Sequence, residues 1–207
     1  MKIKQQKMIG QFLTEEFGKE KGEALFDRQS ETLDALTAGV EETSDSRKKT
    51  LVQTILPRIA LYTVLLNEGS PVEDAYGYMR KYMLEKVAAQ KHASMLKMEK
   101  VPGFYALYSK IFLKIMRKTD LQESEQRRDK SSFDVTIRKC LWHTACVEHG
   151  CPELCRLFCD VDNVTYGGLA KIGFSRTQTL GYGGDCCDFH FFQKNAERIR
   201  RKSDVQT

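Results

Sequence analysis

Two adjacent cysteines, Cys186 and Cys187, lie between Asp185 and Asp188 in the segment GYGGDCCDFHFF, directly after a glycine-rich turn. A cysteine thiolate is a nucleophile and a metal ligand, and a carboxylate beside it can take up or deliver a proton. The segment is therefore a candidate for thiolate, carboxylate or metal chemistry. The alternative is purely structural, because a free cysteine also packs as a small hydrophobe.

The seven cysteines of the chain all lie between Cys140 and Cys187. Their odd number, the chain length and the lack of a recognisable export signal argue against a disulfide scaffold, so we expect reduced thiols that belong to a local site. The sequence contains no Cys-x-x-Cys pair, which is the strongest zinc motif. His143 and His149 lie near Cys140 and Cys146, which leaves a mixed Cys/His/Asp metal site open.

A helix must position three of these thiols. Apolar residues recur at helical spacing from Cys151 to Leu169, with Pro152 near the start and two glycines near the end. At about 100° per residue, one stripe of this helix is apolar and faces the core, and the neighbouring stripe carries thiols, a carboxylate and a phenol. The members of the second stripe are Cys151, Cys155, Cys159, Asp162 and Tyr166.

Two strands must position the remaining groups. Residues 172–180 and 186–193 alternate in polarity around a glycine-rich turn, which predicts a β-hairpin or two closely joined strands. On the second strand Cys187 faces one way and Asp188 the other. On the first strand Arg176 shares a face with apolar neighbours, so its charge requires a carboxylate partner from the protein or from a ligand.

The rest of the chain predicts helices followed by strands. Helical spacing extends over most of the first two-thirds, and residues 51–66 are apolar nearly all round, as expected of a central buried helix kinked at Pro57. Residues 120–132 are polar throughout and indicate a linker, after which residues 133–137 alternate as in a half-buried strand. We therefore predict an α+β fold, with an N-terminal helical bundle packed on a C-terminal antiparallel sheet and one intervening helix.

The predicted parts are a helical part at residues 1–125, a cysteine-rich strand-helix-strand part at residues 133–195, both within one continuous domain, and a basic tail at residues 196–207. Hydrophobic residues make up 41% and charged residues 29%, which is ordinary for a globular protein. The net charge of +5 is concentrated at the two ends and not on a basic face with interleaved aromatics, so we expect no nucleic-acid partner.

No segment predicts a membrane span or an export signal. The most apolar stretch, residues 51–66, is interrupted by Gln53, Pro57 and Arg58, and it is too short and too polar to cross a bilayer. The N-terminal segment has basic residues but no apolar run long enough for a signal peptide. We therefore expect a cytoplasmic protein without a membrane partner.

The ordered motifs between Cys140 and Phe191 resemble the L-2-amino-thiazoline-4-carboxylic acid hydrolase family. The C-terminal mark of that family reads here as Arg176-Thr-Gln-Thr-Leu180, then Gly184-Asp185, then Cys187-Asp-Phe-His-Phe191. The upstream segment LPRIALYTVLLNEGSPVEDAYGYMRKYM also looks like the helical part of the family, so the resemblance extends from about residue 50. It implies a hydrolase that opens a cyclic amidine-like acid to a carbamoyl cysteine.

A 2-amino-thiazoline-4-carboxylate offers an electrophilic C=N carbon, a ring sulfur that can leave, and a carboxylate. For such a substrate we expect Arg176 to pair with the carboxylate, because its planar fork suits bidentate binding, and Tyr166 to contribute to the binding site. Cys159 or Cys187 would supply a thiolate, either as the nucleophile or as a metal ligand.

Proton transfer and metal binding have several candidates. Asp162, Asp185 or Asp188 would move protons or activate water. A hydroxide bound to a divalent metal, such as zinc or manganese, would serve the same hydrolysis, and the cofactor is otherwise left open. The expected metal ligands are Cys140, Cys159, Cys187 and His143.

The expected partner is a small-molecule substrate, and association into a homo-oligomer is left open. The main alternative is a non-catalytic module that binds a small ligand or a metal, since the strand-helix-strand order is also similar to small-molecule-binding domains related to vinyl reductases. In a third, structural interpretation the thiols only pack and Arg176 forms an internal salt bridge.

Overall fold

The computed structural model describes residues 2–41, 44–69 and 71–194. The chain forms two compact units that alternate along the sequence: the first consists of Met1–Lys86 with Leu141–Leu157, and the second of Val87–Cys140 with Phe158–Thr207. The α+β class is confirmed, since helices precede a four-stranded antiparallel sheet. The predicted parts at residues 1–125 and 133–195 follow chain order and stay a prediction, and the predicted tail at residues 196–207 lies outside the described residues.

The first unit is helical. A π-helical turn, Leu51–Ile55, joins α3 to α4, and Pro57 lies in the first turn of α4. Almost every residue of α4 from Leu56 to Leu65 is buried, as the apolar pattern predicted. The helices of this unit are α1 (Lys2–Phe17), α2 (Lys19–Ala38), α3 (Asp45–Thr50), α4 (Leu56–Asn67), α5 (Val72–Lys81) and α8 (Leu141–Glu148).

The continuous helical segment Asp45–Asn67 is long and apolar enough to cross a membrane by length and composition alone. In the structure, 61% of its most apolar window is buried inside the protein. That burial is what a core helix shows.

Gly22 of α2 allows the backbones of α1 and α2 to approach closely. A Cβ at this position would lie 2.7 Å from the carbonyl oxygen of Leu13 and from the backbone of Thr14, and backbone cannot move aside as a flexible side chain can. We expect Gly22→Ala to lower the free energy of unfolding by about 2–3 kcal/mol. Urea unfolding followed by circular dichroism measures this change.

Gly77 of α5 is the matched control for this substitution. It is exposed, and a Cβ there meets nothing within 4 Å. Gly77→Ala should stabilise the protein by about 0.5–1 kcal/mol, because alanine favours the helix. A Gly22→Ala protein as stable as wild type would contradict the close approach of α1 and α2.

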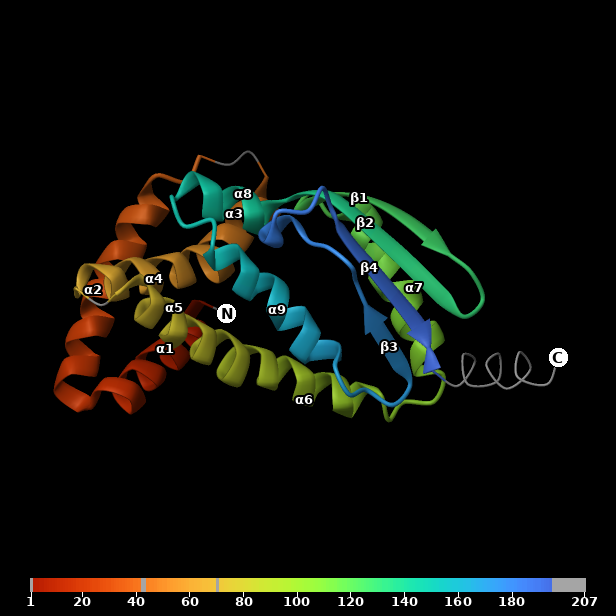
Figure 1. Cartoon of the computed structure of the whole chain (residues 1–207), viewed down its shortest axis with the longest axis horizontal. Coiled ribbons are helices and arrows are strands. Elements are labelled where there is room, and N and C mark those ends of the chain that lie inside the picture. Colours follow the sequence, from red (N-terminus) through yellow and green to blue (C-terminus); the bar gives the residue numbers. More distant parts are fainter. Residues whose placement is uncertain (1, 42–43, 70, 195–207) are drawn as a thin grey trace. The chain divides into compact units, whose positions relative to one another are not determined.

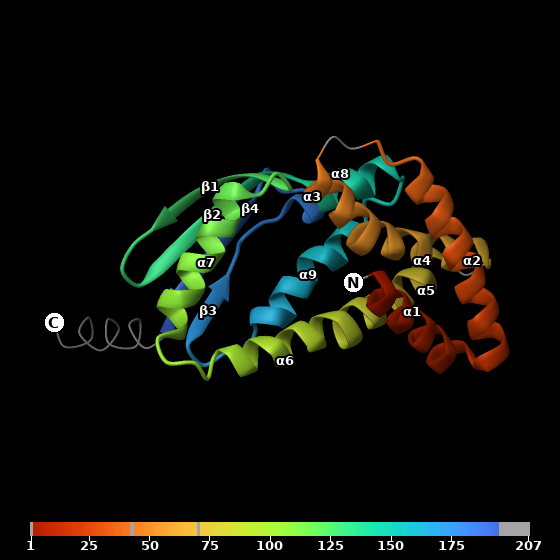
Figure 2. The same cartoon turned by 180° about the vertical axis from the view of Figure 1, so that it is seen from behind.

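The second unit contains the sheet, with strand order β1-β2-β4-β3 and antiparallel pairing throughout. The α-helices α6 and α7 belong to this unit, and α9 (Leu154–Tyr166) begins in the first unit and ends in this one. Figures 1 and 2 show α7 lying across one face of the sheet. The bounds are α6 (Ala89–Met98), α7 (Phe104–Lys118), β1 (Gln122–Arg128), β2 (Ser132–Cys140), β3 (Ile172–Ser175) and β4 (Cys187–Gln193).

The covered face of the sheet carries the core of this unit. Phe191 of β4 stacks on Phe133 of β2, with ring centroids 4.8 Å apart, and contacts Phe112 of α7 and Tyr166 of α9. Cys187 belongs to the same cluster of buried residues. The predicted alternation of β4, with Cys187 and Phe191 on one face, is therefore confirmed.

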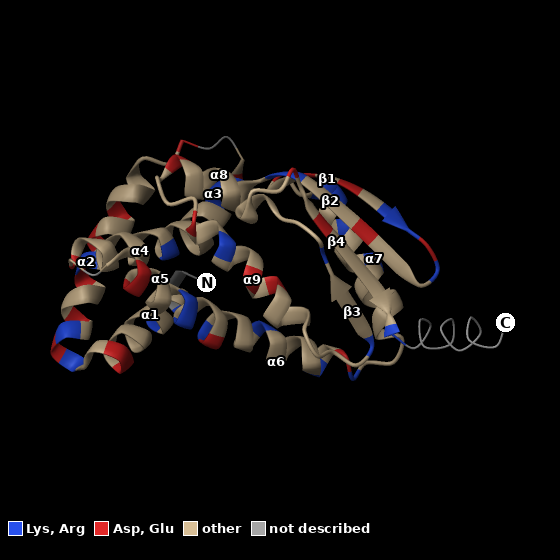
Figure 3. Cartoon of the chain, viewed as in Figure 1, with Lys and Arg blue, Asp and Glu red and all other residues tan. Residues whose placement is uncertain are grey.

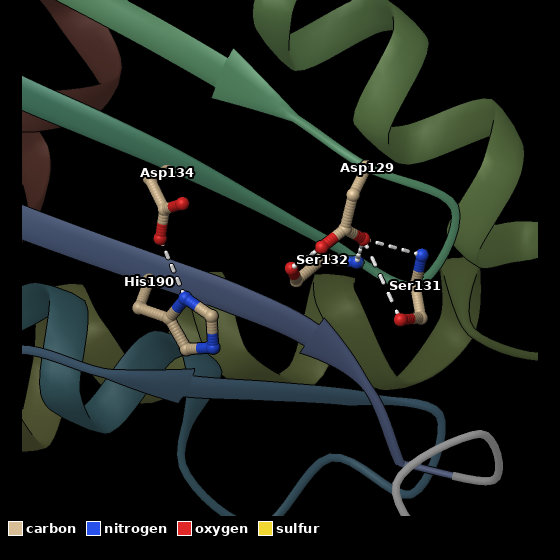
Figure 4. A network of polar contacts seen from close by, with 5 residues as sticks. All are labelled: Asp129, Ser131, Ser132, Asp134 and His190. Atoms are coloured by element: carbon tan, nitrogen blue, oxygen red, sulfur yellow. Dashed lines mark hydrogen bonds and ion pairs between the residues drawn. The ribbon is translucent and has the colours of Figure 1, made fainter.

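The opposite face of the sheet is polar. His190 Nδ1 lies 2.6 Å from Asp134 Oδ1 on the neighbouring strand (Figure 4).

In the β1–β2 turn, Asp129 accepts hydrogen bonds from the backbone N–H groups of Ser131 and Ser132 and from the Ser132 hydroxyl. These bonds lower the pKa of Asp129 to about 2, so the carboxylate stays ionised and fixes the turn.

Three sequence predictions need correction in this unit. Residues 120–132 are not a linker, because they include the edge strand β1. The predicted strand over residues 172–180 ends at Ser175, and an extended loop and a 3₁₀ turn, Leu180–Tyr182, follow it. The predicted helix over residues 151–169 is shorter, since α9 spans Leu154–Tyr166.

Candidate active site

Arg176 follows the end of β3, and its side chain is only 9% exposed. Its Nη2 lies 3.6 Å from Asp160 Oδ1 on α9, and the guanidinium carbon lies 6.0 Å from the ring centre of Phe174. The other terminal nitrogen, Nη1, is buried and has no hydrogen-bond partner among the described residues. One side of the guanidinium is thus paired within the protein, and the other retains an unused donor.

Asp160 is a site residue that sequence reasoning missed. It binds Arg176 through Oδ1 and accepts a hydrogen bond from the Tyr182 hydroxyl through Oδ2 at 2.8 Å. Asp160 does not belong to the predicted stripe of thiols on this helix. The requirement that Arg176 have a carboxylate partner was the one available signal, and it did not say which carboxylate.

Asp162 lies near Arg176 on α9. Burial raises its pKa to about 6, while the positive charges of Lys91 and Arg176 act in the opposite direction and Cys159 adds to the rise. A carboxyl group that titrates close to neutral pH can both accept and deliver a proton in one reaction cycle. The structure therefore places a group suited to general acid–base chemistry beside the guanidinium.

Cys159 of α9 and Cys187 of β4 lie together. The two thiols are hydrogen-bonded to each other. The Sγ atom of Cys187 also accepts a hydrogen bond from the N–H of Leu180 at 3.4 Å, and the nearby Cys140 raises the pKa of Cys187 slightly further. The contact with Cys159 and burial raise the pKa of Cys187 well above its usual value. Cys187 is accordingly a neutral thiol at ordinary pH.

The predicted metal ligands do not form a recognisable site. Within residues 2–41, 44–69 and 71–194, no group of three or more His, Cys, Asp or Glu side chains is arranged to hold a metal ion. Cys140, Cys159 and Cys187 belong to the second unit, whereas His143 lies in α8 of the first. Metal binding by these four residues stays a prediction.

Tyr166 of α9 packs against the hydrophobic core of the sheet-containing unit. Its hydroxyl accepts a hydrogen bond from the Tyr108 hydroxyl at 2.8 Å, and its ring packs edge-on against Phe191. Burial raises its pKa, and the nearby charge of Asp162 adds to this effect. Tyr166 is thus a neutral phenol close to Asp162, and its role in substrate binding stays a prediction.

The two aspartates that flank the paired cysteines differ from Asp162 in their surroundings. Asp188 accepts hydrogen bonds from the backbone N–H groups of Thr177 and Gln178, at 3.0 and 2.8 Å, and from the Thr177 hydroxyl. Burial alone would raise its pKa, but these hydrogen bonds outweigh burial and lower it. Asp185 is exposed, and its backbone N–H donates to the Gln178 side chain.

Asp188 therefore holds the loop that directly follows Arg176. We expect Asp188→Ala to lower the free energy of unfolding at neutral pH by about 2–3 kcal/mol, because two backbone donors and a hydroxyl lose their acceptor. The pKa of Asp188 is lower in the folded protein than in the unfolded chain. The stabilisation by Asp188 is therefore fully present above the unfolded-state pKa, and it is lost as the pH falls through the folded-state pKa.

Denaturant unfolding at neutral and acidic pH measures both the loss and its pH dependence. Asp185→Ala is the matched control and should stay within about 0.5 kcal/mol of wild type, since its side chain is exposed. Equal stability of the two variants would show that Asp188 does not hold the loop.

Comparison with known proteins gives one decisive match. A family model described as L-2-amino-thiazoline-4-carboxylic acid hydrolase matches residues 48–191, which is more than half of the chain. The chain belongs to this family. The part of the chain that matches the L-2-amino-thiazoline-4-carboxylic acid hydrolase family contains Arg176, Asp160, Asp162 and both thiols of the Cys159–Cys187 pair.

Other comparisons add no functional argument. No curated protein sequence matches the chain. Among solved structures, the unliganded Fe(II) H-NOX protein from K. algicida has a TM-score of 0.35 and 12% identity, over 93% of this chain and 96% of that one. An H-NOX protein from S. oneidensis in the Fe(II)NO state has a TM-score of 0.36 and 13% identity, over 90% and 97% of the two chains.

Proposed function

We propose that this protein is a hydrolase that opens a small cyclic amidine-like acid, similar to 2-amino-thiazoline-4-carboxylate. The observation that supports this most strongly is that Arg176, with its unused buried donor, lies close enough to Asp162, with a pKa of about 6, for its charge to act on that carboxyl group. Arg176 can bind the carboxylate of an acid substrate, and Asp162 can take the proton from a water molecule that attacks the C=N carbon. Membership of the hydrolase family is consistent with both.

Arg176 is proposed to bind the substrate carboxylate through Nη1. Its opposite side is already fixed by Asp160 and by the ring of Phe174, so the guanidinium is oriented before the substrate arrives. A charge-assisted hydrogen bond to a buried guanidinium is among the strongest polar contacts that a protein offers. This contact would hold the ring in one orientation relative to Asp162.

Asp162 is proposed to activate water. Its carboxylate takes a proton from a water molecule as the water oxygen bonds to the C=N carbon, and the electrons of the double bond move to nitrogen. Asp162 returns this proton to the ring nitrogen, which leaves a neutral tetrahedral carbon that bears a hydroxyl group. Asp162 then takes the hydroxyl proton as a carbonyl forms and the bond from this carbon to the ring sulfur or the ring nitrogen breaks, and it delivers that proton to the departing atom. One water molecule is consumed, and the product is an open-chain carbamoyl cysteine.

Attack by a thiolate is the competing route. The raised pKa of Cys187 opposes it, because a neutral thiol is a poor nucleophile. We expect Cys187→Ser and Cys159→Ser each to retain ring opening within about threefold of wild type. A loss of about a hundredfold in either variant would return a thiolate to the mechanism, and elemental analysis of the same samples would reveal a metal that the thiols bind.

Binding without turnover is the second candidate function. The unused donor of Arg176 would fit a carboxylate ligand equally well in a non-catalytic module. A 2-amino-thiazoline-4-carboxylate that protects wild type against thermal unfolding, yet is recovered unchanged after prolonged incubation, would favour this alternative.

A further inference from the structure

A polar cavity lies within the sheet-containing unit, at the start of α7. Its volume is about 320 Å³, and three basic side chains line it, those of Arg128, Lys130 and Lys171, together with Tyr105 and Gln193. Among the described residues that line it, none is acidic. Arg176 and Asp162 are not part of this cavity, so it is separate from the candidate active site.

The N-terminus of α7 opens into this cavity. The helix has 15 residues, follows Gly103 in a left-handed conformation, and has neither a side-chain cap nor an acidic residue in its first turn. The N–H groups of Phe104 and Leu107 bind the carbonyls of Val101 and Gly103. Those of Tyr105 and Ala106 remain for a ligand, since the first N–H groups of a helix have no partner within it. Uncapped N–H groups and the helix dipole together attract anions.

Tyr105 provides an independent sign that the cavity receives a ligand. The residue is only 6% exposed, and its hydroxyl has no hydrogen-bond partner among the described residues. Tyr105 lines the cavity, and burial raises its pKa to about 12, so the hydroxyl keeps its proton at neutral pH. A buried hydroxyl without a partner is costly unless a bound group supplies one.

The carboxylate between Arg128 and Lys130 does not neutralise these two residues, and the third basic residue, Lys171, donates from Nζ to the carbonyl of Val101 at 3.3 Å. Figure 3 shows basic positions at the end of β1 and on the turn that follows. Asp129 stands between Arg128 and Lys130 in sequence, but its oxygens accept hydrogen bonds from Ser131 and Ser132 (Figure 4). Neither Arg128 nor Lys130 forms an ion pair with a described residue.

We propose that this cavity binds the phosphate group of a small molecule or of a lipid headgroup. A phosphate carries up to two charges and three acceptor oxygens, which matches the three cations, the two free backbone donors and the hydroxyl of Tyr105. A carboxylate, with one charge and two oxygens, would leave several of these donors unused.

Titration of the full-length protein with inorganic phosphate and with pyrophosphate, by calorimetry at low salt, tests this proposal. We expect saturable binding at one site, weakened about tenfold or more by Arg128→Gln and by Lys130→Gln. Tyr105→Phe should weaken it by about threefold or more, because the phenol loses only its hydroxyl.

Arg127→Gln is the matched control, because it removes the same charge from the same strand. Arg127 is paired in register with outward-facing Asp134, whereas Arg128 is paired with inward-facing Phe133. The control should bind phosphate within about twofold of wild type. Equal weakening by Arg127→Gln and Arg128→Gln would show general charge attraction and overturn the proposal, as would the absence of saturable binding of either probe.

Vesicles distinguish the two sources of phosphate. Sedimentation with phosphatidylcholine vesicles that contain phosphatidic acid, lost in Arg128→Gln and kept in Arg127→Gln, would support a lipid headgroup. Saturable binding of soluble phosphate without sedimentation would support a phosphorylated small molecule. Sedimentation that both variants lose equally would contradict a built headgroup site.

Discussion

Replacing Asp162 by asparagine is expected to lower kcat for ring opening by about a hundredfold to ten-thousandfold, which is the usual contribution of a general acid–base group. The asparagine side chain keeps the size of the carboxyl group but can no longer take a proton from water. In wild type, the carboxylate is the active form, so activity should rise with pH through the pKa of about 6. Steady-state kinetics across this range measure both effects.

The same substitution should stabilise the folded protein at neutral pH. The pKa of Asp162 is about 6 in the folded state and 3.8 ordinarily, so folding favours the protonated form. This contribution is fully present below the unfolded pKa and is lost as the pH rises through about 6, where the ionised carboxylate must be buried. We expect Asp162→Asn to gain up to about 3 kcal/mol at neutral pH and little near pH 4.

Urea unfolding of both proteins at the two pH values checks this sign. A neutral-pH stability of Asp162→Asn at or below that of wild type would contradict a destabilising burial of the Asp162 carboxylate. An active variant with unchanged kcat would assign the proton transfer to another group.

Arg176→Gln is expected to lower kcat/KM for a carboxylate-bearing substrate by about a hundredfold to a thousandfold, because a buried charge-assisted contact is lost. It should also move the midpoint of the pH profile upward. The positive charge of Arg176 lowers the pKa of Asp162, so removing the charge lets that pKa rise further.

Arg176→Lys and a shortened substrate serve as the two controls. The lysine keeps the charge but lacks the planar fork, so KM should rise while the pH midpoint stays near that of wild type. The analogue 2-amino-thiazoline, which has no carboxylate, should react equally slowly with wild type and Arg176→Gln. Wild-type activity of Arg176→Gln on the full substrate would exclude Arg176 from substrate binding.

The sequence was sufficient to predict the α+β class because its periodicity is strong where burial is one-sided. Phe133, Val135 and Ile137 alternate with polar residues on β2, and all three are buried. The alternation of β4 likewise placed Cys187 on the core face. In both strands one face is apolar and the other polar, so the period of two is visible in the residues themselves.

The sequence was misleading where tertiary contacts decide the structure. β1 reads QESEQRR and has no apolar face, because it is an edge strand that gains its stability from pairing with β2. The alternating polarity of residues 172–180 predicted one strand, but the part after Ser175 is a loop. In this loop the side chain of Asp188, and not a neighbouring strand, accepts hydrogen bonds from the backbone N–H groups of Thr177 and Gln178.

The candidate site was only partly accessible from the sequence. Residue spacing placed Cys187 on the core face of its strand, but the contact between Cys159 and Cys187 depends on how the helix packs against that strand. The pairing of Arg176 with Asp160 did not follow from the spacing either, because it depends on where the loop after β3 returns to α9. The difference between Asp162 and Asp188 depends on desolvation and hydrogen bonding, which residue spacing does not reveal.

The most direct test of the proposed hydrolysis uses 2-amino-thiazoline-4-carboxylate labelled with ¹³C at its C=N carbon, followed by NMR with full-length protein from about pH 5 to about pH 8. We predict conversion of this carbon to a carbamoyl carbon, at a rate that rises through about pH 6 in wild type and stays at background in Asp162→Asn. A label that wild type leaves unchanged at every pH, or one that Asp162→Asn converts as fast as wild type, would contradict the proposed mechanism.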